Sequence, residues 1–253
     1  MTPSACPLCG TLAATNLREV SDHDTGETFL IVRCTNCDHQ FLSPAPRVEE
    51  LERYYQSELT GGAMRRPPSD FVRGLQRIGL RRETALLRTL VQPHGGIVDL
   101  GAGDGALVQM LAESGYRAGA CDFYPQEQWP GGSLPYAQVD LHGGRLTVAD
   151  IHRPLGGAPA AVILRHVLEH LHEPQKVLST IAESGARFIQ ITVPNAASPM
   201  ARWFGSNWYY WDPPRHLQFF TPQTLRAACE SSGFRLRASG TAGLDEVVTS
   251  LHR

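Results

Sequence analysis

The sequence lacks long hydrophobic runs and any large excess of charge of one sign. In its 253 residues, no apolar stretch approaches the roughly 20 residues that a membrane-spanning helix needs, and the N-terminus lacks the basic and apolar segments of a signal peptide. Lysine and arginine number 23 against 25 acidic residues, a net charge of −2, which argues against binding nucleic acid or acidic membranes through bulk charge. We therefore expect a cytoplasmic protein with no membrane association, for which nucleic acid is a disfavoured partner.

The composition is that of a globular protein. Hydrophobic residues make up 42% of the chain and charged residues 19%, slightly below the usual charged share of about 25%. A chain of this length can bury a sizeable core without covalent cross-links. The composition excludes a fibrous, disordered or secreted disulfide-rich protein.

Four of the six cysteines form two closely spaced pairs near the N-terminus, namely Cys6 with Cys9 and Cys34 with Cys37. Each Cys-x-x-Cys turn can aim two thiolates at one ion, and two such turns complete the tetrahedral sulfur shell that Zn²⁺ prefers. Residues 28–33 form a β-rich run into the second pair, as in a zinc ribbon. The alternatives are disulfides or free thiols. If zinc binds, it either holds this small segment together or supports recognition of a partner, and we favour the structural role.

The segment between the cysteines and the centre of the chain is punctuated by proline and glycine. A Pro-containing linker over 41–46 precedes a helical pattern over 48–55, and a turn-rich stretch over 60–68 follows. Ser69 and Asp70 then begin a second predicted helix. Seven arginines lie between residues 65 and 88. They form either a solvated helix face, which we favour, or a basic flank beside a phosphate-bearing substrate.

The centre of the chain carries the strongest signal. A buried-strand pattern over 96–100 runs directly into the sequence Gly-Ala-Gly-Asp-Gly at 101–105, and a helix is expected over 106–112. A strand, a glycine turn and a helix N-terminus form a cradle for an anionic or nucleotide ligand. A second strand over 117–121 leads to Asp122, which is placed to accept both ribose hydroxyls, and Asp140 follows a third strand and could accept from an adenine amino group. Further strands are expected over 160–164 and 188–193.

These motifs resemble those of class I S-adenosylmethionine-dependent methyltransferases. DLGAGDG at 99–105 is similar to the first motif of that family, HVLEHLHEP at 166–174 to the segment after its fourth strand, and ITVPN at 191–195 to the end of its fifth. The cysteine ribbon, FLSPAP at 41–46 and DPPRHLQFFTPQTL at 212–225 resemble a bacterial subgroup that includes small-molecule and sugar C-methyltransferases of antibiotic pathways. The resemblance spans roughly residues 5–235, and because the sequence ends at residue 253 we expect no counterpart of the long additional C-terminal domain of the sugar enzymes. A nicotinamide dehydrogenase is the rival for the glycine turn alone.

The resemblance implies S-adenosyl-L-methionine as methyl donor, S-adenosyl-L-homocysteine as product, and a cofactor site in which His166 lies below the sulfonium. The expected cofactor-binding residues are Asp99, Gly101, Ala102, Gly103, Gly105, Asp122, Phe123, Asp140, Leu141 and His166. The expected zinc ligands are Cys6, Cys9, Cys34 and Cys37. His39, next to the second cysteine pair, could replace one ligand, although a solvated side chain is the more common outcome.

An aromatic segment after the fifth strand is the candidate wall of the acceptor site. It contains Trp203, Phe204 and residues 208–216, where Arg215 could bind an anion and His216 could act as a base near neutral pH. The alternative is a packed loop that precedes the helix beginning at Pro222. The candidate catalytic residues are His216, His166, His170, Tyr209 and Arg215. Glu169, His170 and His172 could also suggest a second metal, which we do not expect because they follow a strand directed at the cofactor pocket.

The sequence therefore predicts an α/β protein with a Rossmann-like, doubly wound methyltransferase sheet and a small N-terminal zinc ribbon. We expect a zinc ribbon over 1–45, a helical linker or lid over 46–92 and the cofactor-binding domain over 93–253. The expected function is methylation of a small, polar or anionic metabolite at O, N or C in bacterial secondary metabolism, by a monomer or homodimer. The alternatives are an rRNA base methyltransferase and a non-catalytic zinc- and nucleotide-binding subunit. A sixth strand over 235–239 and only a short seventh over 246–251 are expected.

Overall fold

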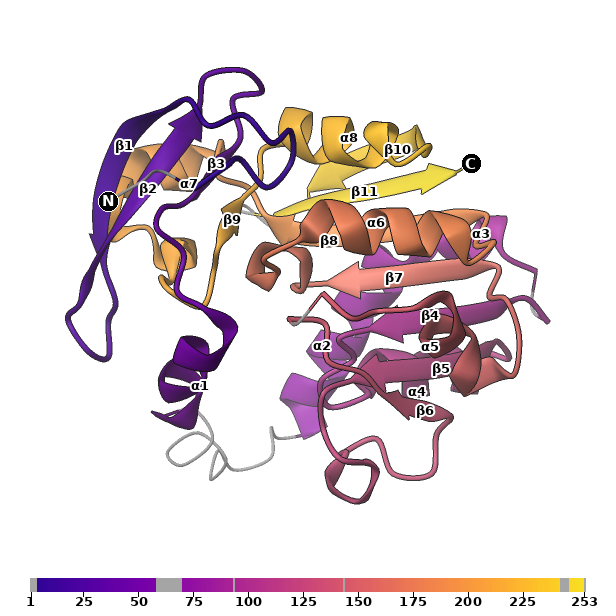
Figure 1. Cartoon of the computed structure of the whole chain (residues 1–253). Helices are drawn as coiled ribbons and strands as arrows, with labels where there is room; N and C mark the ends of the chain where they lie inside the picture. Colours follow the sequence, from indigo (N-terminus) through magenta and orange to yellow (C-terminus); the bar gives the residue numbers. More distant parts are fainter. Residues whose placement is uncertain (1–3, 58–69, 93, 143, 242–245, 253) are drawn as a thin grey trace.

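The protein contains two β-sheets, one large and one small, in the computed structural model (Figure 1). The structure describes residues 4–57, 70–92, 94–142, 144–241 and 246–252. The strands are β1 (Ala14–Ser21), β2 (Thr28–Cys34), β3 (Gln40–Leu42), β4 (Gly96–Leu100), β5 (Arg117–Asp122), β6 (Tyr136–Gln138), β7 (Ala161–Arg165), β8 (Phe188–Pro194), β9 (Gln218–Phe219), β10 (Arg235–Thr241) and β11 (Glu246–His252). The α-helices are α1 (Val48–Ser57), α2 (Asp70–Glu83), α3 (Ala85–Leu90), α4 (Ala106–Glu113), α5 (Val148–His152), α6 (Pro174–Glu183), α7 (Pro199–Phe204) and α8 (Pro222–Ser231), and the short 3₁₀ turns include η4 (Leu168–His170) and η6 (Tyr209–Trp211).

The larger sheet has seven strands in the order β10-β11-β8-β7-β4-β5-β6. The five strands from β8 to β6 are parallel, and β11 runs antiparallel between β8 and β10. This is the doubly wound α/β class that the sequence predicts. The order reverses beside β4, so the carboxyl ends of β4 and β7 diverge there and leave room for a ligand.

Alternate residues of the central strands face two different helix layers, because side chains along a strand point to opposite faces. Val98 and Val162 belong to a buried cluster with residues of α5, α6 and α8. Ile97 and Ile163 belong to a second cluster with residues of α2, α3 and α4. The sheet is therefore covered on both faces, which explains why its central strands are almost uniformly apolar.

The C-terminal hairpin is longer than expected. Both β10 and β11 contain seven residues, and β11 pairs along β8 from the pair Glu246–Pro194 to the pair His252–Phe188. The sixth strand extends two residues beyond the expected range 235–239, and the seventh matches the expected range 246–251 to within one residue. Pairing with β8 supports the seventh strand along its whole length.

The smaller sheet joins the N-terminal segment to the C-terminal half of the chain. Its antiparallel order is β1-β2-β3-β9, and β9 comes from the segment DPPRHLQFF. The backbone N–H of Leu42 also donates to the carbonyl of Leu217 at 2.9 Å. The sheet of the cysteine ribbon is thus completed by β9, a strand from far along the chain, which pairs with β3 (Figure 1).

Two tryptophans of the expected acceptor wall lie in the core between the small sheet and the rest of the protein. Trp208 is 3% exposed and Trp211 is fully buried, and they share a cluster with Ile31 of β2 and Leu217. Trp203, by contrast, is 84% exposed. The expectation that this whole aromatic segment lines the acceptor site is therefore corrected. The rings of Trp208 and Trp211 pack against the ribbon instead, because burial of their apolar area there is favourable.

The helical segment after the ribbon matches the expected pattern in part. α1 begins at Val48 and extends to Ser57, and Asp70 starts α2. The predicted cap at Ser69 and the turn-rich stretch over 60–68 lie outside the described residues. Among the described arginines of the basic stretch, Arg77 pairs with Glu113 and Arg88 lies over the ring of Tyr116. No helix among the described residues has the length and apolarity to cross a membrane.

Candidate functional site

The glycine turn lies between the end of β4 and the start of α4. Gly101, Gly103 and Gly105 have φ angles of 77°, 55° and 76°, a region that favours glycine. A Cβ on Gly101 would lie 2.3 Å from Cγ2 of Val167, and one on Gly105 would lie 3.0 Å from Cα of Gly131. The turn can therefore pack against Val167 and Gly131 only because Gly101 and Gly105 lack side chains.

Asp122, at the end of β5, is fixed by the same turn. Its Oδ2 accepts the backbone N–H of Gly103 at 2.7 Å, and its Oδ1 accepts that of Phe123 at 2.7 Å. Burial raises the pKa of Asp122, and these two backbone donors oppose that effect. The N–H groups of Gly101 and Ala102 donate to the carbonyl of Cys121. The carboxylate is thus held at the carboxyl end of the parallel strands, as predicted from the sequence.

Asp99 is a buried carboxyl group on β4. It is 3% exposed, and its Oδ1 has no hydrogen-bond partner among the described residues. Burial raises the pKa of Asp99 to about 7, although the nearby Arg165 opposes this effect. A group of this kind is expensive to bury in its charged form, so a cationic ligand group beside it would relieve the cost.

A cavity of about 170 Å³ lies at the carboxyl ends of β4 to β7. Its lining residues are Gly101, Asp122, Phe123, Val139, Leu141, His142, His166, Val167, His170 and Leu171. Asp140, expected at the adenine edge, is exposed and does not line the cavity, and its Oδ1 accepts the backbone N–H of His142 at 3.0 Å. Its sequence neighbours Val139 and Leu141 line the cavity instead.

His166 follows β7 in a left-handed conformation, with φ of 54°. Its Nδ1 lies 3.4 Å from Oε1 of Glu169, and its Nε2 lies 3.4 Å from Oε1 of Glu246. Burial disfavours the charged ring, but the two carboxylates outweigh this and raise the pKa of His166 to about 9. An imidazolium therefore stands at the rim of the cavity at neutral pH.

His170 and His216, from distant parts of the sequence, lie against each other. Their ring centroids are 4.7 Å apart in an edge-to-face arrangement. Nδ1 of His170 contacts the carbonyl of Arg215 at 2.9 Å, and Nδ1 of His216 contacts the carbonyl of Tyr210 at 2.8 Å. Burial, with the neighbouring His216, lowers the pKa of His170 to about 4. The three predicted catalytic histidines, His166, His170 and His216, are thus brought together near the cavity.

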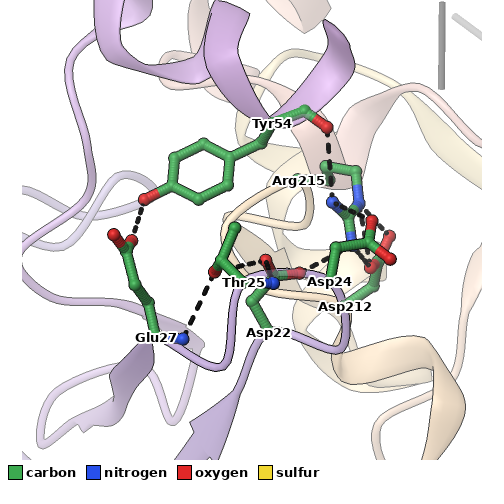
Figure 2. Close-up of polar contacts among 7 residues, drawn as sticks. All are labelled: Asp22, Asp24, Thr25, Glu27, Tyr54, Asp212 and Arg215. Carbon is green, nitrogen blue, oxygen red and sulfur yellow. Dashed lines mark hydrogen bonds and ion pairs between the residues drawn. The ribbon is translucent and has the colours of Figure 1, made fainter. Parts of the chain in front are cut away.

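Arg215 lies in a different environment from the one expected. It is 5% exposed, and its Nη2 lies 2.9 Å from Asp22 and 2.5 Å from Asp212, with Asp24 at 3.6 Å from Nη1. Figure 2 shows the guanidinium enclosed by these carboxylates and the backbone carbonyl of Tyr54. The expectation of an anion clamp is corrected: Arg215 joins the β1–β2 hairpin to the loop before β9.

Tyr209 is not brought to the cavity either. Its side chain is 74% exposed and contacts the ring of Tyr210 at a centroid distance of 5.5 Å. The hydroxyl of Tyr210, by contrast, donates to Glu246 at 3.1 Å, and Glu246 also faces His166. Adjacent positions on η6 point to opposite sides, so the inward tyrosine is the neighbour of the predicted one.

The comparisons with known proteins match this geometry. A family model described as a methyltransferase domain matches residues 72–239, which contain the glycine turn, Asp122 and the histidines. The chain belongs to the methyltransferase domain family. It is a methyltransferase. No curated protein matches the sequence.

Solved structures show the same fold at low sequence identity. A magnesium protoporphyrin IX methyltransferase from Synechocystis PCC 6803 with bound SAH is 18% identical, with a TM-score of 0.58, over 81% of this chain and 99% of that one. A 1,6-didemethyltoxoflavin-N1-methyltransferase from Burkholderia thailandensis, with bound 1,6-didemethyltoxoflavin and S-adenosylhomocysteine, is 17% identical, with a TM-score of 0.59, over 93% of this chain and 99% of that one. A SAM-dependent methyltransferase from Archaeoglobus fulgidus is 17% identical, with a TM-score of 0.55, over 79% and 99%.

The four ribbon cysteines of this methyltransferase form one group. Their sulfur atoms all lie within 4.8 Å of one another, with Cys6–Cys37 and Cys9–Cys34 contacts of 3.5 Å each. Tetrahedral zinc with Zn–S bonds of about 2.3 Å would separate its sulfurs by about 3.8 Å, whereas a disulfide bond is about 2.05 Å long. The arrangement fits a metal ion and no cysteine pair is bonded.

His39 is neither solvated nor part of the cysteine group. It is fully buried, burial lowers its pKa to about 4, and its Nε2 contacts Oε1 of Gln218 at 2.9 Å. Nε2 of Gln218 in turn donates to the carbonyl of Leu171, a residue of the cavity lining. The expectation of an exposed or ligating histidine was wrong because β9 covers it.

Sequence reasoning missed several residues around the cavity, chiefly Trp129 and Val167. Trp129 is 4% exposed, and its Nε1 donates to the carbonyl of Gly103 at 3.0 Å, so it fixes the glycine turn from outside. Val167 packs against Gly101. The dipeptide Pro130-Gly131 after Trp129 is a pattern typical of a turn, but the contact of Trp129 with the glycine turn depends on the tertiary structure.

Proposed function

We propose that this methyltransferase transfers a methyl group from S-adenosyl-L-methionine to a small, polar or anionic metabolite at an oxygen, nitrogen or carbon atom. The observation that carries the proposal is the cavity, which joins the glycine turn and Asp122 on one side to His166 and His170 on the other. A donor site and a set of polar groups therefore share one space. The likeness of the sequence to bacterial enzymes of secondary metabolism supports a role there.

The proposed cofactor site uses the glycine turn, the carboxylates and the apolar lining. S-Adenosylmethionine supplies an activated methyl group on a cationic sulfur. We assign the ribose hydroxyls to Asp122, the close backbone approach to Gly101 and Gly103, and the neighbourhood of the cofactor's ammonium group to Asp99. Ala102, Gly105, Phe123, Asp140, Leu141 and His166 complete the proposed set. The adenine lies between Phe123 and Leu141 in this assignment, with Asp140 at its outer edge.

The acceptor side is proposed to use the histidine group. The acceptor loses a proton and its electron pair forms the bond to the methyl carbon, while the bond from sulfur to that carbon breaks and its electrons stay on sulfur. His216 or His170 is placed to take the proton, and the charged His166 to orient an anionic acceptor. Arg215 positions this group, since its carbonyl contacts His170. Tyr209 lies on the surface, where it could contact only the outer part of an acceptor.

We further propose that Cys6, Cys9, Cys34 and Cys37 hold one structural Zn²⁺. Their sulfur atoms all lie within 4.8 Å of one another, and a cation is needed to keep such a group of thiols deprotonated. We retain a ribbon over 1–45, a helical linker or lid over 46–92 and a cofactor domain over 93–253, with β9 completing the ribbon sheet.

Calorimetric titration with S-adenosylhomocysteine tests the donor site. Wild-type protein and E183Q, which changes an exposed side chain on α6, are expected to bind equally, whereas D122A loses about tenfold or more in affinity because the ribose contact is removed. S-Adenosylhomocysteine formation in a screen of small acceptors then identifies the substrate. Failure of wild-type protein to bind either form of the cofactor would refute the proposal. RNA as the methylated product would replace its substrate class.

A further inference from the structure

A second group of metal-ligating side chains lies beside the cavity. Glu169 and His170 on η4 and His216 before β9 bring one ligand atom each within 4.8 Å of one another. Glu169 is 1% exposed and His216 is 7% exposed. The group is separate from the ribbon cysteines, and His172, which belonged to the sequence-based group, instead contacts the carbonyl of Pro46 at 2.7 Å.

Both histidine rings are oriented by backbone carbonyls. The contact of His170 Nδ1 with the Arg215 carbonyl, and that of His216 Nδ1 with the Tyr210 carbonyl, fix Nδ1 as the protonated nitrogen. Each ring then carries its lone pair on Nε2. Metal-bound histidines in proteins are held in this way, with the second ring nitrogen donating to a carbonyl or carboxylate.

The carboxylate of Glu169 supplies the second, independent observation. Both of its oxygens are buried, and neither has a hydrogen-bond partner among the described residues. The nearest cation, Nδ1 of His166, lies 3.4 Å away, which is an ion-pair distance without hydrogen-bond geometry. A buried carboxylate with no hydrogen bond is destabilising, so a positive ion within this group would satisfy it.

We propose that Glu169, His170 and His216 bind one divalent transition-metal ion, in addition to the zinc of the ribbon. Two imidazole nitrogens and one carboxylate are the ligand set of open zinc and related sites, which keep a position for water or substrate. Cys₄ sites are closed, so the two sites differ in chemistry. Because His170 lines the cavity, the open position faces it.

The role of this ion rests on the proposed function. With His170 and His216 as metal ligands, neither of them takes the acceptor's proton; an acceptor hydroxyl bound at the open position would have a lowered pKa and would release its proton to water. The oxygen lone pair then forms the bond to the methyl carbon, and the sulfur keeps the electrons of the bond that breaks. The inference therefore specifies an acceptor with an oxygen donor able to ligate a divalent ion.

Metal content per chain tests the site directly. Purified full-length protein is loaded with excess Zn²⁺, desalted and analysed by plasma mass spectrometry together with protein concentration. We expect two zinc ions per chain in wild-type protein and one in both E169Q and H216Q. H152Q, whose histidine contacts the carbonyl of Ser184 instead, is the matched control and should retain two.

Cobalt substitution separates the two sites without relying on a count. Thiolate-to-cobalt charge transfer reports the ribbon, and it should persist in E169Q and H216Q while the weaker bands of the nitrogen and oxygen site disappear. E169Q is nearly isosteric, so it keeps the test decisive if H216Q fails to fold. One metal per chain in loaded wild-type protein, or two in both variants, would overturn the proposal. Unchanged S-adenosylhomocysteine binding in that case would leave the proposed function standing.

Discussion

Replacing Asp99 with asparagine is expected to change the stability of the protein in opposite directions at low and high pH. The pKa of Asp99 rises from 3.8 to about 7 on folding because the carboxyl group is buried. Below about pH 4 both states are protonated and no penalty exists. As the pH rises towards 7, the unfolded carboxyl ionises while the folded one stays protonated, so stability falls, and the loss levels off once the folded group also ionises.

The size of the effect follows from the pKa difference. About 3 pKa units at about 1.4 kcal/mol each give a loss of about 4 kcal/mol as an upper bound. Asparagine cannot ionise, but its amide brings a donor that the site does not partner, at a cost of about 1–3 kcal/mol at every pH. D99N should therefore be less stable than wild type by about 1–3 kcal/mol near pH 4 and more stable by a similar amount near pH 8.

Urea denaturation of wild type and D99N at both pH values measures this difference. E183Q, which changes an exposed side chain on α6, is the control. A stability difference between D99N and wild type that is the same at both pH values would refute the assignment of a raised pKa to Asp99. D99N should also bind S-adenosylhomocysteine more weakly, since the cofactor's ammonium group loses its neighbouring charge.

Three further predictions concern the glycine turn, the ion pairs of Arg215 and the cysteine ribbon. G101A, which places a Cβ 2.3 Å from a neighbouring side chain, should lose about 1–3 kcal/mol in urea denaturation and bind S-adenosylhomocysteine more weakly in calorimetry; unchanged binding would contradict the close approach. R215Q leaves the carboxylate of Asp22 buried without its cation and should lose about 3–5 kcal/mol in the same assay, whereas R226Q, on an exposed helix pair, should change stability by less than about 1 kcal/mol. C34S should lose the ribbon metal and lower the Tm measured by circular dichroism, with C229S as the cysteine control that keeps the metal; equal metal content in both would argue against the cysteine site.

The central fold and the donor side of the site were accessible from the sequence, because their signals are local. Strand 96–100 is confirmed with the same bounds, and the turn that follows it requires positive φ angles that glycine supplies. Asp122 could be placed because a residue at the end of a parallel strand lies at the same sheet edge as the turn. The cysteine pairs likewise carry their geometry in their spacing.

The acceptor side was accessible only in part, because long-range contacts decide it. Arg215 and His216 are adjacent in sequence, yet one points to the ribbon carboxylates and the other to His170. The left-handed conformation of Asp212, with φ of 34°, turns the chain before them. The local sequence pattern does not indicate which side chains Arg215 and His216 will contact.

The sequence by itself determined the order of the central elements, the glycine turn and the two closely spaced cysteine pairs, since each depends on residues close together in the chain. Only the tertiary structure decided that β9 completes the ribbon sheet, that His39 is buried under it and that Glu169 meets His216. The physical reason is that burial and pairing partners depend on which surfaces meet. Those surfaces come from segments that are separated in the sequence, by 179 residues in the case of His39 and Gln218.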